Sequence, residues 1–84
     1  MLGPRLLAPG DLLAAAIQSR EDHGYIMDVG SQTVRGFVTS KAMAKLQQPP
    51  SVGQVVWAVV TRSEPGVVTL NPAPAKVRQE AWSR

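Results

Sequence analysis

The sequence lacks cysteine altogether and contains a single histidine, His23, in 84 residues. Without cysteine there can be no disulfide, no thiolate zinc site and no thiol nucleophile, and one histidine excludes most zinc sites and Ser-His-Asp triads. The longest apolar runs, 12–17 and 55–60, have six residues each, whereas a membrane-spanning helix needs about 20. We therefore expect no enzyme activity, no cofactor, no metal site and no membrane partner.

Charge and aromatic side chains are also scarce. Nine Lys and Arg against six Asp and Glu give a formal net charge of +3, and only 5% of the residues are aromatic. A domain of this length buries a little over ~60% of its unfolded surface, so its core must come mainly from Leu, Ile, Val and Met. Pro4, Pro9 and Asp11 interrupt the apolar run that a signal peptide would need. We interpret the chain as one small untargeted domain and as a piece of a longer protein.

Proline and glycine divide the sequence into segments as short as strands. The alternation of apolar and polar residues, together with β-branched side chains, predicts strands over 24–29, 33–38, 54–62 and 67–70. Glu64-Pro65-Gly66 predicts a turn between the last two strands. Ser40 with apolar residues at helical spacing after it predicts a short helix over 40–47, capped by Ser40 and ended by Pro49 and Pro50.

The same alternation assigns faces to several side chains. Tyr25 is expected to point into the core, and Trp57 is expected to be a core residue because it lies in the middle of the most apolar strand. Gly24 and Gly36 occur at the start of one strand and inside another, which suggests bends or a close approach of another part of the backbone.

Residues 11–19 are ambiguous. Their alanines favour a helix, because alanine is the best helix former and a poor strand former. As a strand, the segment would place Leu13, Ala15 and Ile17 on one face. The order of the elements resolves the choice, because a first segment, two strands, a short helix and two further strands is the order of the five-stranded OB-fold barrel. We therefore predict an all-β barrel with a strand at 11–19.

Five sequence fragments extend this prediction: Gly10, His23 to Val29, Gly36-Phe37-Val38, Val52 to Val56 and Gly66 to Leu70. In this order and spacing they resemble the S1 motif, an OB-fold RNA-binding domain, over residues 10–71. Residues 72–84 would then form a C-terminal tail or linker, anchored by Trp82. The amino-acid sequence of residues 21–30 is similar to that of an early repeat in the ribosomal RNA processing protein five family, the multi-repeat ribosome-biogenesis factors of the nucleolus.

The resemblance implies a non-catalytic, single-stranded RNA-binding repeat. In that family the module acts on pre-ribosomal RNA in the nucleolus of the nucleus, beside neighbouring S1 repeats and pre-ribosome proteins. The positions that contact RNA in the family, two aromatics, a histidine, an acid and an arginine, hold His23, Ile26, Thr39, Ser63 and Val67 here. Only His23 retains a ring that can stack, and each lost stacking partner costs ~1 to 3 kcal/mol per base. We therefore expect weak binding by a domain that is a monomer in isolation.

The candidate RNA-binding residues are two rings and four basic side chains: His23, Arg35, Phe37, Lys41, Lys45 and Arg62. The rings are candidates for stacking on bases, and the basic side chains for tracking phosphates across strands two and three. Each also has a structural interpretation, as a backbone hydrogen-bonding, core or solvated surface residue, and a net charge of +3 does not decide between the two. The alternative function is a degenerate barrel that serves as a protein-interaction or spacer module.

Overall fold

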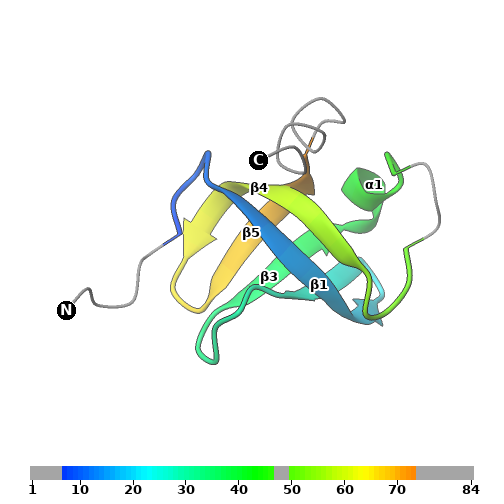
Figure 1. The fold of residues 1–84 in the computed structure, drawn as a ribbon, viewed down its shortest axis with the longest axis horizontal. Helices are drawn as coiled ribbons and strands as arrows, with labels where there is room; N and C mark the ends of the chain where they lie inside the picture. The colour runs from blue at the N-terminus through cyan, green and yellow to red at the C-terminus, as the bar shows by residue number, and fades with distance from the viewer. Residues whose placement is uncertain (1–6, 47–49, 74–84) are drawn as a thin grey trace.

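The computed structural model describes residues 7–46 and 50–73, and within them five strands close into a barrel (Figure 1). The elements are β1 (Leu12–Glu21), β2 (Gly24–Asp28), β3 (Arg35–Thr39), α1 (Ser40–Met43), β4 (Val55–Glu64) and β5 (Val67–Pro72). The strands follow one another around the barrel as β1-β2-β3-β5-β4, with β3 and β5 parallel and all other neighbours antiparallel. This confirms the predicted all-β, five-stranded barrel with a short helix between the third and fourth strands.

The alanine-rich segment is a strand, as the element order predicted and against its own helical propensity. β1 pairs with β2 on one edge and with β4 on the other, and Ala16 lies opposite both Asp28 and Val55. The intrinsic preference of an alanine for a helix over a strand amounts to only a few tenths of a kcal/mol, roughly, per residue. Backbone hydrogen bonds on both edges of the strand outweigh that cost.

The barrel interior is filled by aliphatic side chains and methionine. Met27, Val38, Ala58 and Leu70 have no exposed surface, and Tyr25 is buried, as its alternation predicted. Gly36 also faces inward. A Cβ added there would lie 2.8 Å from Leu70 Cδ1 and 2.9 Å from Val29 Cγ1, so the close approach at this glycine comes from core side chains and not from another backbone segment.

Two predictions about local structure were wrong in detail. Trp57 is half-buried on the outside of β4, between the buried Val56 and Ala58, and does not belong to the core. Thr39, rather than Ser40, caps α1, because its Oγ1 accepts a hydrogen bond from the Ala42 amide at 3.1 Å.

The helix is shorter than predicted. It ends at Met43, and part of the 40–47 segment lies outside the described residues. With four residues, α1 is far shorter than a bilayer-crossing helix, and no other helix lies in the described part of the chain. The expected tail over 72–84 lies outside the described residues from position 74 onward.

Candidate nucleic-acid interface

Two rows of outward side chains cross four neighbouring strands. Residues paired between adjacent strands point to the same side of a sheet, and the residues between these positions, such as Gly36 and Val68, are buried inside. The first row is Arg62, Thr69, Phe37 and Ile26, and the second is Glu64, Val67, Arg35 and Asp28. We call these eight residues the charged face. It brings together three of the predicted site residues, Arg35, Phe37 and Arg62.

The phenyl ring of Phe37 lies over Gly24 on this face. A Cβ added to Gly24 would lie 2.6 Å from Phe37 Cζ and 2.2 Å from the Val38 carbonyl oxygen. The missing side chain of Gly24 therefore provides the space in which the ring rests on the sheet, and the predicted close approach at this glycine is confirmed. Phe37 is half-buried in this position, so part of its surface remains accessible beside the β1–β2 turn that carries His23.

Arg62 forms an ion pair on the face. Its Nε donates to Glu64 Oε1 at 2.8 Å, and the two side chains are 73% and 48% exposed. Alternating positions of β4 place both residues on the outer side, opposite Thr69 and Val67 of β5. An ion pair this exposed contributes only ~0 to 1 kcal/mol, so the Arg62 guanidinium can exchange its carboxylate for a phosphate at little cost.

Arg35 is exposed at the start of β3 and makes no ion pair with any residue that the structure describes. It lies opposite Asp28, but the Asp28 carboxylate accepts a hydrogen bond from the Gly30 amide at 2.8 Å in the following turn. Its guanidinium is therefore the most available cation on the charged face.

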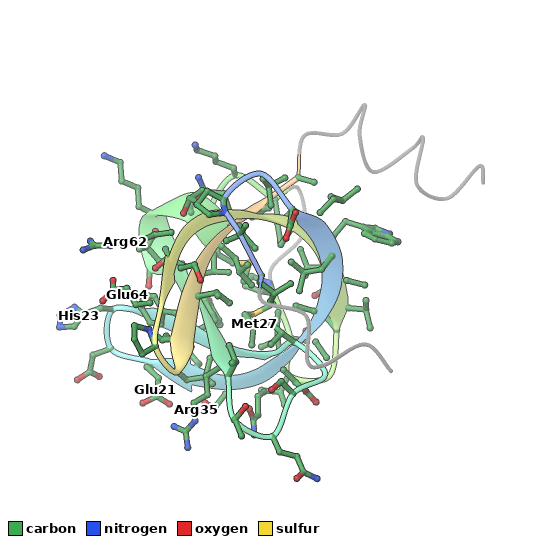
Figure 2. All side chains as sticks on the ribbon, turned by 90° about the vertical axis from the view of Figure 1, so that its left-hand side faces the viewer. Glu21, His23, Met27, Arg35, Arg62 and Glu64 are labelled. Carbon is green, nitrogen blue, oxygen red and sulfur yellow. The ribbon has the colours of Figure 1, made fainter. Side chains whose placement is uncertain are left out.

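His23 is exposed in the turn between β1 and β2, and its carbonyl oxygen accepts a hydrogen bond from the Ser40 amide at 3.0 Å. This bond ties the turn to the first residue of α1. Figure 2 shows Glu21, His23, Arg35, Arg62 and Glu64 projecting from the same side of the barrel, while Met27 points into it.

The remaining two predicted residues are less central. Lys41 lies on α1 and Lys45 in the turn after it, and both are exposed. They belong to neither row of the charged face. The two lysines are connected to the charged face only through α1, which begins beside the His23 turn and packs against β2, β3 and β5.

The acidic residues of this face were not among the predicted site residues. Glu64 is two positions after Arg62, so strand alternation alone would have placed the two side chains together. Among the residues in 7–46 and 50–73 there are five basic and five acidic side chains, so this part of the chain carries no net charge and the excess of +3 comes from the remaining positions. In the same ranges, no three His, Asp or Glu side chains gather as a metal-binding set.

Comparison with known proteins gives no matching family model but two clear relatives. The chain is 35% identical to the protein RRP5 homolog of Mus musculus and 31% identical to that of Homo sapiens, over 97 aligned positions that cover 99% of this chain. The chain is homologous to a segment of RRP5. It spans 5% of the length of each of these relatives, and the resemblance to the family inferred from residues 21–30 is confirmed.

Solved structures confirm the OB-type fold of this RRP5-like module. A chain of the a/eIF2alpha–aDim2p–rRNA complex from Pyrococcus horikoshii has a TM-score of 0.77 and 17% identity, with 94% of this chain and 53% of that chain covered. The intact alpha subunit of aIF2 from Pyrococcus abyssi has a TM-score of 0.72 and 17% identity, with 98% and 36% covered. At these identities the likeness establishes the fold.

Proposed function

We propose that this chain is a non-catalytic, single-stranded RNA-binding module of a multi-repeat protein that acts in pre-ribosomal RNA processing in the nucleolus. The homology to RRP5 and the S1 resemblance support the setting. The observation that carries the binding role is the Phe37 ring lying on Gly24 with Arg35 in the next outward position of the same strand. An aromatic surface beside an unpaired guanidinium is the combination that single-stranded nucleic-acid sites use.

The face suggests how an RNA strand would bind. A base stacks on the accessible side of Phe37, and Arg35 contacts a phosphate on one side of it. Arg62 lies two strands away through Thr69, which is about 10 Å at ~4.8 Å per strand, and contacts a second phosphate after releasing Glu64. Stacking and phosphate contacts carry little base information, so binding should depend weakly on sequence.

The charge balance limits the affinity of the isolated module. Five acidic side chains offset the five basic ones in the described part of the chain, and Glu64 competes with phosphate for Arg62. In a chain of several modules this weakness is tolerable, because linkage raises the effective concentration of each successive contact. The partners would then be pre-ribosomal RNA, neighbouring repeats and pre-ribosome proteins.

An amide chemical-shift titration with short single-stranded RNAs of different sequence tests the proposal. We expect chemical-shift changes on β2 and β3. The logarithm of the association constant should fall linearly with the logarithm of the salt concentration, with a slope of about −0.7 for each phosphate contacted. Arg35→Gln should weaken binding to every sequence and lower that slope by about 0.7. Arg20→Gln is the control: it removes the same charge from a position paired with the inward-facing Tyr25 and outside both rows.

Phe37→Leu tests the stacking step, because leucine keeps apolar bulk but loses the ring. Loss of one stacked base should cost ~1 to 3 kcal/mol. If millimolar RNA shifts no amide on β2 or β3, or if Arg35→Gln and Arg20→Gln have equal effects, the RNA-binding proposal fails. The protein-interaction or spacer module then becomes the better account, and the balanced charge of the described residues already favours it.

A further inference from the structure

Thr69 carries the only hydroxyl group among the eight residues of the charged face. It lies on β5 and is paired with Phe37 of β3 on one side and with Arg62 of β4 on the other. Its backbone carbonyl oxygen accepts a hydrogen bond from Thr61 Oγ1 at 3.2 Å, whereas its own Oγ1 has no hydrogen-bond partner among the residues that the structure describes. The side chain is half-buried, but Oγ1 is not fully enclosed. The face therefore offers one hydroxyl that can still donate and accept a hydrogen bond.

The row that contains Thr69 changes in chemical character from strand to strand. From β2 to β4 it presents an apolar side chain, an aromatic ring, a hydroxyl and a cation: Ile26, Phe37, Thr69 and Arg62. Adjacent strands are about 4.8 Å apart, so the hydroxyl lies one strand from the ring and one strand from the guanidinium. A nucleotide presents its base, its ribose and its phosphate in the same order. A nucleotide whose base stacks on Phe37 and whose phosphate reaches Arg62 therefore places its ribose over Thr69.

The other side chains of the charged face offer no equivalent group for a ribose. Val67, the other outward residue of β5, is apolar, and the Asp28 carboxylate already accepts a hydrogen bond from the Gly30 amide at 2.8 Å. Glu64 is paired with Arg62 at 2.8 Å, and its negative charge repels the phosphates on either side of a ribose. A hydroxyl is neutral, so it can approach the sugar of a polyanionic strand without this repulsion.

We propose that Thr69 Oγ1 hydrogen-bonds the ribose 2′-hydroxyl of the nucleotide stacked on Phe37, and that this contact makes the module prefer RNA to single-stranded DNA. The 2′-hydroxyl is both a donor and an acceptor, and it is the group by which a protein distinguishes RNA from DNA. Stacking on a ring and contacts with phosphates are available to both nucleic acids. The inference rests on the proposed RNA-binding function and adds to it the residue that would select the sugar.

Oligouridylate and oligodeoxyuridylate of equal length test this inference, because they differ only in the 2′-hydroxyl. We expect the full 84-residue chain to bind the ribo strand roughly 2- to 12-fold more tightly, which corresponds to one net hydrogen bond. Thr69→Val keeps the branched shape but loses the hydroxyl, so the affinity for the ribo strand should fall to that for the deoxy strand. The affinity for the deoxy strand and the salt dependence of both should stay unchanged, because no charge is removed. Thr69→Ser retains the hydroxyl and should retain the preference.

Thr61→Val is the matched control. Thr61 lies outside both rows and its hydroxyl already donates to the Thr69 carbonyl oxygen, so its loss should leave the ratio of the two affinities unchanged. Equal binding of the two strands by the unmodified chain, a ribo preference that persists in Thr69→Val, or an equal loss of affinity for both strands in that variant would overturn the role of Thr69 while RNA binding stands. Binding to neither strand would instead refute the proposed function, and the role of Thr69 with it.

Discussion

Replacement of Gly24 by alanine tests the packing on which the charged face depends. The added Cβ would lie 2.2 Å from the Val38 carbonyl oxygen and 2.6 Å from Phe37 Cζ, whereas non-bonded carbon contacts are optimal at about 3.5 to 4.0 Å. The ring can rotate away, but the carbonyl belongs to the paired strand β3, where Gly24 lies opposite Thr39. The substitution must therefore both displace Phe37 and separate β2 from β3 at this point.

The expected cost follows from this overlap. Inserting a group into a well-packed site costs ~1 to 3 kcal/mol, and the backbone contact places Gly24→Ala in the upper part of that range. For a domain of this size each kcal/mol lowers the melting temperature by about 4 to 8 °C. Thermal unfolding followed by circular dichroism should therefore show a decrease of about 10 to 20 °C in the melting temperature, and RNA affinity should fall as well because the Phe37 ring leaves its place.

A double-mutant cycle with Phe37→Leu separates the two contacts. If the ring is part of the strain, Gly24→Ala should cost less in the Phe37→Leu background, and the remaining cost reports the Val38 carbonyl. Gly10→Ala is the control: Gly10 has φ +96° but no atom within 4 Å of an added Cβ, so its cost should be the same in both backgrounds. A melting temperature unchanged within about 2 °C for Gly24→Ala would refute the reasoning.

Three further predictions concern single residues. Met27→Ala removes a side chain with no exposed surface and should destabilise by ~2 to 5 kcal/mol in denaturant titrations, and a loss below ~1 kcal/mol would mean that the core is not as described. Thr39→Ala removes the α1 cap and should cost ~1 kcal/mol, while Ser40→Ala should cost clearly less, and equal losses would contradict the assignment of the cap. Glu64→Gln frees the Arg62 guanidinium and should strengthen RNA binding at low salt, with the gain disappearing at high salt, whereas weaker binding would show that Glu64 contributes to the site.

The sequence by itself determined the turns and strands that can be recognised from a pattern of a few neighbouring residues. The turn before Gly24, the Pro65-Gly66 turn and the alternation around Tyr25 and Val38 are short-range signals, because side chains alternate with a period of two and glycine tolerates turn conformations. They predicted β2, β3 and β5 to within two residues at each end. The order of the elements then predicted the barrel, and the sequence fragments predicted its family.

Tertiary structure decided which side chains face inward where the local sequence shows no alternation of apolar and polar residues. Every residue from 55 to 60 is apolar, so alternation could not tell which of Trp57 and its neighbours would face inward. Barrel closure against β1 and β5 turned Val56 and Ala58 into the core and Trp57 outward. β1 is a strand although its residues favour a helix, because it pairs with β2 and also with β4, which lies about 40 positions further along the chain, and the local propensity of residues 11–19 carries no information about that pairing. The pairing of β5 with both β3 and β4 gathered Arg62, Glu64 and Arg35 on one face, because neighbours in a sheet are set by strand order and not by distance in sequence.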